Sequence, residues 1–303
     1  MSKILLLGGN GQVGQELRRS LAPLGEIVAT TRSGELPDGS RCAALDLNDL
    51  DAIAPLIARI QPDVVVNATA HTAVDRAEDE PEAAFRANAQ APGLLAQACA
   101  ARGATLLHYS TDYVFDGSGS RPYREDDPTA PLGVYGASKL AGEQAIAASG
   151  ARHLILRTAW VYATHGANFL RTMLRVGAER DELRVVADQV GCPTPAWLIA
   201  DVSADILRQG IAEPGVRHLV AAGETTWHGF AEAIFERAFE RGLIARKPRV
   251  HPIATADYPT RAQRPAYSVL DTSRLSGEYG LTLPDWRVAL DRTLAPDSAK
   301  SPA

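Results

Sequence analysis

The N-terminal segment reads KILLLGGNGQVGQELRRSL over residues 3–21. An apolar run, residues 4–7, leads directly into glycines spaced Gly8-x-x-Gly11-x-x-Gly14, and apolar residues at helical spacing follow. Glycine permits a turn with positive φ and lets backbone N–H groups approach a pyrophosphate, while the helix N-terminus adds partial positive charge. The segment therefore predicts a strand, a dinucleotide-binding loop and a helix. A plain tight turn between strand and helix is the alternative interpretation.

The rest of the first half alternates apolar runs with amphipathic ones. Strands are predicted at 4–7, 27–30, 64–67, 105–109 and 154–157, and helices at 12–21, 50–59, 82–102 and 135–148. Apolar strands that alternate with helices predict an α/β fold, here a Rossmann-like doubly wound parallel sheet with helices on both faces.

The pattern loosens after residue 160, where prolines become frequent and helices are predicted at 168–176, 197–208 and 230–241. We expect residues 1–160 to form an NAD(P)-binding Rossmann domain. Residues 161–296 are expected to form mainly a smaller substrate-binding lobe, with some return to the first domain. The small polar residues 297–303 predict a disordered tail.

Composition narrows the classes of partner. The 303 residues are 46% hydrophobic and carry a formal charge of −5, so nothing indicates a global attraction to nucleic acid or to anionic lipid. Cys42, Cys99 and Cys192 are too few and too scattered for a disulfide framework, and each is expected to be a buried thiol. No signal peptide or apolar span long enough for a membrane is evident, so the sequence predicts a cytoplasmic protein.

The end of the second predicted strand bears on the choice of cofactor. NAD-selective sites usually place an acidic residue there, against the ribose 2′-hydroxyl. This sequence has Thr30-Thr31-Arg32-Ser33 instead, and a guanidinium with hydroxyls suits a 2′-phosphate. Thr31 and Arg32 therefore predict a preference for NADPH, with NADH as an accepted alternative; a solvated loop arginine is the other interpretation.

Tyr135 and Lys139 stand four residues apart in a predicted helix, so both side chains lie on one face. A neighbouring ammonium and the positive ring of an oxidised nicotinamide favour the phenolate, and we expect them to lower the pKa of Tyr135 so that the phenol can exchange a proton. A strand that ends in Tyr109-Ser110-Thr111-Asp112 places a hydroxyl, from Thr111 or Ser110, at the edge of the sheet where this fold carries its chemistry. An exposed lysine and a packing tyrosine are the alternative.

These motifs resemble those of the extended short-chain dehydrogenase/reductases, and among them the dTDP-4-dehydrorhamnose reductases. The segments that carry the resemblance, which spans nearly the whole chain, are GQVGQEL (11–17), NATAHTAVD (67–75), STDYVFDG (110–117), YGASK (135–139), RTAWVY (157–162), DQVGCPT (188–194) and Arg264-Pro265.

The resemblance implies roles for individual residues. Thr111, Tyr135 and Lys139 match the catalytic triad, and Asp112 and Trp160 lie against the deoxysugar together with Thr111 and Tyr135. The cofactor site is implied at Gly11, Gln12, Val13, Asp46, Leu47, Ala70, His71 and Thr72, alongside Gly8, Tyr135 and Lys139. For Asp75 and His71 a purely loop-fixing role stays open, as does the role of residues 258–264, which either contact the nucleotide or cap the lobe.

One family feature is missing from the sequence. Some relatives hold Mg²⁺ between subunits through three glutamates. Glu16 matches the first, but Trp197 and Arg287 stand at the other two positions. Mg²⁺ requires oxygen ligands. We therefore expect no metal site and a monomer or weak homodimer.

The implied activity is reduction of the 4-keto group of dTDP-4-dehydro-L-rhamnose to dTDP-L-rhamnose, in the bacterial rhamnose pathway. Two alternatives stay open: another nucleotide-sugar reductase or epimerase of the superfamily, and a non-catalytic subunit that binds the dinucleotide. The partners expected are a nucleotide sugar and no nucleic acid or membrane.

Overall fold

The computed structural model describes residues 2–295. Within that range seven parallel strands form one sheet in the order β11-β6-β5-β4-β1-β2-β3. The strands are β1 (Ser2–Leu7), β2 (Gly25–Thr31), β3 (Ala43–Ala44), β4 (Val64–Asn67), β5 (Thr105–Thr111), β6 (Arg152–Thr158) and β11 (Gly215–His218). The order reverses between β1 and β4, and in open α/β sheets ligands bind at such a point, beyond the carboxyl ends of the strands.

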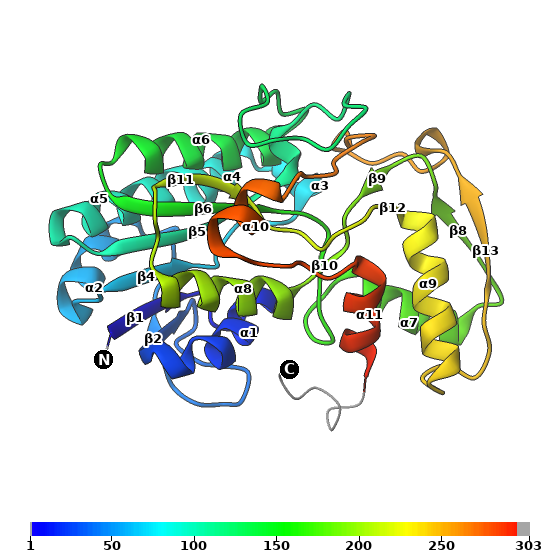
Figure 1. Cartoon of the computed structure of the whole chain (residues 1–303), viewed down its shortest axis with the longest axis horizontal. Coiled ribbons are helices and arrows are strands. Elements are labelled where there is room, and N and C mark those ends of the chain that lie inside the picture. The colour runs from blue at the N-terminus through cyan, green and yellow to red at the C-terminus, as the bar shows by residue number, and fades with distance from the viewer. Residues whose placement is uncertain (1, 296–303) are drawn as a thin grey trace.

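Helices cover both faces of this sheet (Figure 1). The helices α2 (Ile53–Ile60), α5 (Ala91–Arg102) and α6 (Val134–Ala148) pack on one face. The other face carries α1 (Gln12–Ser20) and α8 (Ala196–Gln209). The central strands are buried on both sides, since Leu5 and Leu6 of β1 point to opposite faces and both are fully buried.

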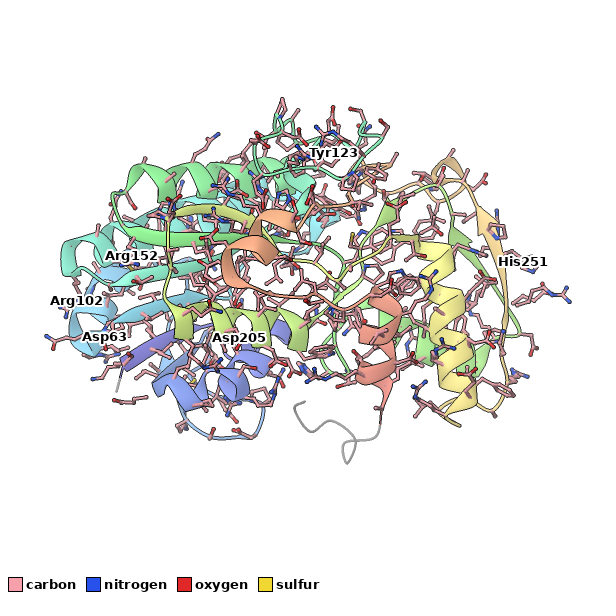
Figure 2. All side chains as sticks on the ribbon, in the orientation of Figure 1. Asp63, Arg102, Tyr123, Arg152, Asp205 and His251 are labelled. Carbon is pink, nitrogen blue, oxygen red and sulfur yellow. The ribbon has the colours of Figure 1, made fainter. Side chains whose placement is uncertain are left out.

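The C-terminal part forms a smaller lobe beyond the carboxyl ends of the strands (Figure 1). Its larger elements are α7 (Phe169–Glu179), β8 (Glu182–Val186), α9 (Trp227–Glu240), β13 (Arg249–Ile253) and α11 (Trp286–Leu294). Figure 2 shows His251 at the outer edge of this lobe, whereas Asp63, Arg102 and Arg152 mark the opposite, amino-terminal edge of the sheet.

Short elements complete the fold. They are β7 (Val161–Tyr162), β9 (Val190–Gly191), β10 (Thr194–Pro195), β12 (Thr225–Thr226), α3 (Val74–Asp79), α4 (Pro81–Phe85), α10 (Ser273–Tyr279), and the turns η1 (Ala22–Leu24), η2 (Leu50–Ala52), η3 (Arg86–Gln90), η4 (Asp112–Val114) and η5 (Thr255–Asp257). None of the helices in the described chain is both long and apolar enough to cross a membrane.

The predicted sheet and helices are confirmed, with three differences. The helix predicted over residues 50–59 begins as the 3₁₀ helix η2 and becomes α-helical at Ile53. The helix predicted over residues 82–102 is three segments, α4, the π-helical η3 and α5. The strand β11 lies within the range predicted for the lobe but pairs with β6 in the main sheet. Some return of this range to the first domain is expected from the sequence. Of the thiols, Cys99 and Cys192 are buried as expected, but Cys42 is only half-buried, so that expectation is wrong for Cys42. The predicted tail lies outside the described residues.

A buried ion pair ties α6 to the sheet. Arg157 on β6 donates from Nε and Nη2 to the two carboxylate oxygens of Glu143, at 2.9 and 2.6 Å. Both side chains are almost fully buried, at 4% and 5% exposure. A bidentate pair of this kind fixes the rotation of α6 about its axis, and therefore the direction in which the preceding turn of α6 points.

We expect Arg157→Met to lower the free energy of unfolding by about 3–5 kcal/mol, because it leaves the Glu143 carboxylate buried without its cation. Urea denaturation measures the change. Arg175→Met is the matched control, since Arg175 and Glu179 form an exposed i,i+4 pair and its loss costs below about 1 kcal/mol. An equally small loss for Arg157→Met would contradict the prediction.

Candidate active site

A cleft of about 950 Å³ opens at the carboxyl ends of β1, β4 and β5. Every residue that the sequence assigned to cofactor or substrate lines it: Gly8, Gly11, Gln12, Val13, Thr31, Arg32, Asp46, Leu47, Ala70, His71, Thr72, Thr111, Asp112, Tyr135, Lys139 and Trp160. The fold therefore brings these distant segments to one place, at the point where the strand order reverses.

The glycine loop has the geometry that a phosphate loop needs. Gly8 has φ +82°, and a Cβ on Gly14 would lie 2.0 Å from the carbonyl oxygen of Gly8. Only glycine at position 14 allows α1 to approach β1 so closely. Gly11 is the N-cap of α1 and provides no side-chain cap, so the first turn presents its N–H groups toward the cleft.

At the end of the cleft beyond β2, Thr31 and Arg32 make different contacts. The Thr31 hydroxyl donates to the carbonyl oxygen of Glu35 and accepts from its N–H, both at 3.0 Å, so it fixes its own loop. Arg32 is exposed at the rim of the cleft. In this structure, Arg32 is the group available to an anion at that end.

The helix α6 carries Tyr135 and Lys139 on its inward face, at the centre of the cleft. Burial raises the pKa of Tyr135 to about 12, and a hydrogen bond with Thr111 offsets part of that rise. Burial also lowers the pKa of Lys139 to about 8, against the opposing effect of Glu143. In the chain without a cofactor Lys139 does not lower the pKa of Tyr135, because burial dominates and Nζ of Lys139 donates to the carbonyl oxygen of Tyr109, at 2.6 Å. The expected joint effect of Lys139 and an oxidised nicotinamide stays a prediction.

Thr111 and Asp112 follow directly on each other at the end of β5. The Thr111 hydroxyl donates to Oδ1 of Asp112 at 3.1 Å, while Oδ2 of Asp112 is buried with no hydrogen-bond partner in the described chain. Burial raises the pKa of Asp112 to about 6. The Ser110 hydroxyl is likewise buried and unpartnered within residues 2–295. Both residues line the cleft, where a ligand would supply partners for these buried oxygens.

Trp160 has a partner that sequence reasoning missed. Its indole stacks on that of Trp227, at the start of α9, with ring centroids 3.6 Å apart and planes 7° apart. Trp160 has φ +45°, an uncommon conformation for a bulky residue, and a Cβ on Gly191 would lie 2.5 Å from its ring. Trp227 also lines the cleft. The only sequence signal for it was an aromatic residue after two threonines, a common helix start.

The segment 258–264 docks on α3. Arg264 Nη2 lies 2.7 Å from Oδ2 of Asp75, the N–H of Ala262 donates to Oδ1 of Asp75 at 3.1 Å, and Arg261 pairs with Asp79. Asp75 is therefore a loop-fixing residue, and Arg264 lines the cleft beside it. For His71, both ring nitrogens are buried without a hydrogen-bond partner in the part of the chain described.

The three positions compared with the family's metal site hold different contacts here. Glu16 accepts from His165 at 3.0 Å and lies 3.6 Å from Arg19. The Trp197 indole N–H donates to Thr293 at 2.9 Å. Arg287 packs on the ring of Trp286. The absence of a magnesium site stays a prediction.

Comparison with known proteins identifies the family. The model of the RmlD substrate binding domain matches residues 2–298. Proteins named dTDP-4-dehydrorhamnose reductase are 46% identical in Escherichia coli (strain K12), covering 96% of both chains, and 48% identical in Burkholderia thailandensis, covering 95% of this chain and 96% of the relative. The crystal structure of the Bacillus anthracis dTDP-4-dehydrorhamnose reductase in complex with NADP has a TM-score of 0.87 at 33% identity, covering 96% of this chain and 98% of that one.

The chain belongs to the dTDP-4-dehydrorhamnose reductase family. The predicted resemblance and fold class are thereby confirmed, and the chain is an NAD(P)H-dependent oxidoreductase of the extended short-chain type. The solved reductase from Clostridium acetobutylicum, at TM-score 0.87 and 35% identity over 96% of this chain and 98% of that one, has the same fold.

Trp227→Leu should abolish the exciton-coupled circular dichroism signal that a face-to-face indole pair produces, because it removes one of the two stacked rings. Circular dichroism of the purified chain measures it. Trp197→Leu is the matched control, since that indole lies on α8 against Arg292. Loss of the signal in the control and its survival in Trp227→Leu would refute the assignment.

Proposed function

We propose that the chain reduces the 4-keto group of dTDP-4-dehydro-L-rhamnose to dTDP-L-rhamnose, with hydride from NADPH and a proton from Tyr135. The observation that carries the proposal is the convergence of Thr111, Tyr135 and Lys139 in one cleft with the glycine loop, in a chain of this family. Assay of NADPH oxidation with this sugar, against UDP- and GDP-linked ketosugars, tests it; equal rates on all three would contradict the dTDP assignment.

The cleft fits a dinucleotide. It is about 950 Å³ in volume, at the upper end of the usual size of cofactor sites. The first turn of α1 is uncapped by any side chain and suits a pyrophosphate, and the orphaned ring nitrogens of His71 lie farther along the same cleft. Gly8, Gly11, Gln12 and Val13 would hold the pyrophosphate, Arg32 the adenosine phosphate with Thr31 fixing the loop beside it, and Asp46 and Leu47 the adenine side.

NADPH, when bound, supplies the hydride. The protein supplies the proton. Because burial raises the pKa of Tyr135 to about 12, its phenol is protonated at neutral pH and can donate as negative charge develops on the substrate oxygen. Thr111 lies beside it. Its hydroxyl donates to Asp112 in the ligand-free chain and would turn to the substrate oxygen to stabilise that charge, while Lys139, in its protonated form, would add a positive field from the next turn of the helix.

Asp112 and Trp160 are proposed to hold the sugar. The unpartnered carboxylate oxygen of Asp112 accepts from a sugar hydroxyl, and an indole offers an apolar face to a deoxysugar ring. The buried thiols of Cys99 and Cys192, whose pKa values burial raises to about 12, are consistent with work in a reducing cytoplasm. As a monomer or weak homodimer the chain would need no partner residue in this cleft.

Tyr135→Phe should lower kcat by about 10²–10⁴-fold, because the general acid is lost, with the Kd of NADPH nearly unchanged. Steady-state kinetics and fluorescence titration of NADPH measure the two. Tyr109→Phe is the control, since its hydroxyl lies 2.7 Å from Ser203 in the core. If Tyr135→Phe keeps a kcat within a few-fold of the wild-type value, Tyr135 is not the general acid.

Arg32→Ser should raise the KM for NADPH about ten- to a hundredfold and leave that for NADH nearly unchanged, because a charge-assisted contact to the extra phosphate is lost. Parallel kinetics with both cofactors measure the effect, with Arg41→Ser as control, an arginine of the same segment that is not among the cleft-lining residues. Equal losses with NADH and NADPH would count against the assignment.

A further inference from the structure

Behind Lys139 lies a chain of hydrogen bonds that the proposed reaction does not use. It runs from the backbone N–H of Thr69 through Asn67 and His108 to Nζ of Lys139. Asn67 ends β4 and pairs in register with His108 on β5. The side chains of Asn67, His108 and Lys139 are all within 2% of full burial, so water does not compete for these contacts.

The direction of the chain is fixed at Asn67. The N–H of Thr69 donates to Oδ1 of Asn67 at 3.1 Å, and a backbone N–H has no way to accept. The Thr69 hydroxyl donates to the same oxygen. The NH₂ group of Asn67 therefore faces His108, with Nδ2 3.0 Å from Nδ1. Since an amide NH₂ only donates, Nδ1 of His108 carries no hydrogen.

His108 then carries its one hydrogen on Nε2. Burial, with the charge of Lys139 as a smaller effect, lowers the pKa of His108 well below its ordinary value, so the ring is neutral. Nε2 lies 3.3 Å from Nζ of Lys139. An N–H donor thus points at the lysine nitrogen.

An N–H that points at Nζ distinguishes the two forms of lysine. An ammonium has three hydrogens and no lone pair, whereas a neutral amine accepts from His108 and still donates to the Tyr109 carbonyl oxygen, 2.6 Å away. One charged group nearby opposes the neutral form of Lys139. Glu143, one turn along α6, favours the ammonium, but its carboxylate is held by Arg157 of β6. Tyr135, on the same face of α6, is a neutral phenol.

We propose that His108 is a positioning residue that sets the protonation of Lys139: its Nε2–H, aimed at Nζ, favours the neutral amine over the ammonium. The inference rests on the proposed function only for what Lys139 then does beside Tyr135. The hydrogen-bond polarity is a property of the chain without its ligands.

The chain has four lysines, at positions 3, 139, 247 and 300, so lysine labelled with ¹³C at Cε gives few signals to assign. In the cofactor-free protein, the Lys139 signal should titrate with a midpoint near 8. In His108→Leu, which removes the N–H donor, the midpoint should rise by about one pKa unit, a tenfold gain in proton affinity.

His108→Gln is the conservative variant. The NH₂ of Asn67 draws the carbonyl oxygen of the substituted side chain toward itself, so the NH₂ group of that side chain again points at Lys139 and the midpoint should stay near 8. His153→Leu is the burial control, since His153 lies on β6 with Nδ1 2.8 Å from the Ala151 carbonyl oxygen and should leave the midpoint unchanged. An unshifted midpoint in His108→Leu, or equal shifts in His108→Leu and His108→Gln, overturns the proposal.

Long-range ¹H–¹⁵N spectra of the wild-type chain test the polarity directly, even where a variant fails to fold. The expected result is a His108 hydrogen on Nε2 throughout the neutral range; a hydrogen on Nδ1 overturns the proposal. Turnover is a separate readout. If the Lys139 midpoint moves as expected while the wild-type chain reduces no ketosugar, the proposed function fails and the assignment of His108 stands.

Discussion

The contact between residues 8 and 14 governs the geometry of the cleft. A Cβ on residue 14 would lie only 2.0 Å from the carbonyl oxygen of Gly8. The helix α1 can therefore start this close to Gly8 only because residue 14 has no side chain. This approach sets the first turn of α1 directly beyond β1, with its N–H groups open to the cleft. A side chain at position 14 would push α1 away from Gly8, and its dipole would then point past the proposed pyrophosphate site.

The positions of Tyr135 and Lys139 depend on a different contact, the buried ion pair between Arg157 and Glu143. Arg157 and Glu143 cost desolvation energy and are weak evidence for stability in themselves. What they provide is orientation, because the bidentate geometry fixes α6 against β6, and Tyr135 and Lys139 stand on the preceding turns of the same helix. The Arg157 guanidinium also opposes the effect of the Glu143 carboxylate on Lys139, although that carboxylate still acts to raise the pKa of Lys139.

The sequence predicted best what is local. The spacing of Tyr135 and Lys139 on one face needs only the helical repeat, and strand-loop-helix order suffices for Gly8 to Gly14. It failed where distant segments meet. The stacking of Trp227 on Trp160 joins residues 67 positions apart, and the docking of Arg264 on Asp75 spans 189 positions, so no periodicity encodes either. The rise in the pKa of Tyr135 in the ligand-free chain was missed for the same reason, since burial depends on the whole fold.

Burial also sets the protonation state in which the ligand-free cleft holds its acid. A tyrosine with a pKa of about 12 is an acid at neutral pH, suited to protonate a developing alkoxide and poorly suited to remove a proton from an alcohol. Oxidation would need the phenolate, which this environment disfavours. The neighbouring lysine shifts the other way, to about 8, because the same low-dielectric surroundings disfavour its charge. Desolvation thus brings both groups toward their neutral forms, and reduction of a carbonyl is the reaction that starts from a neutral phenol.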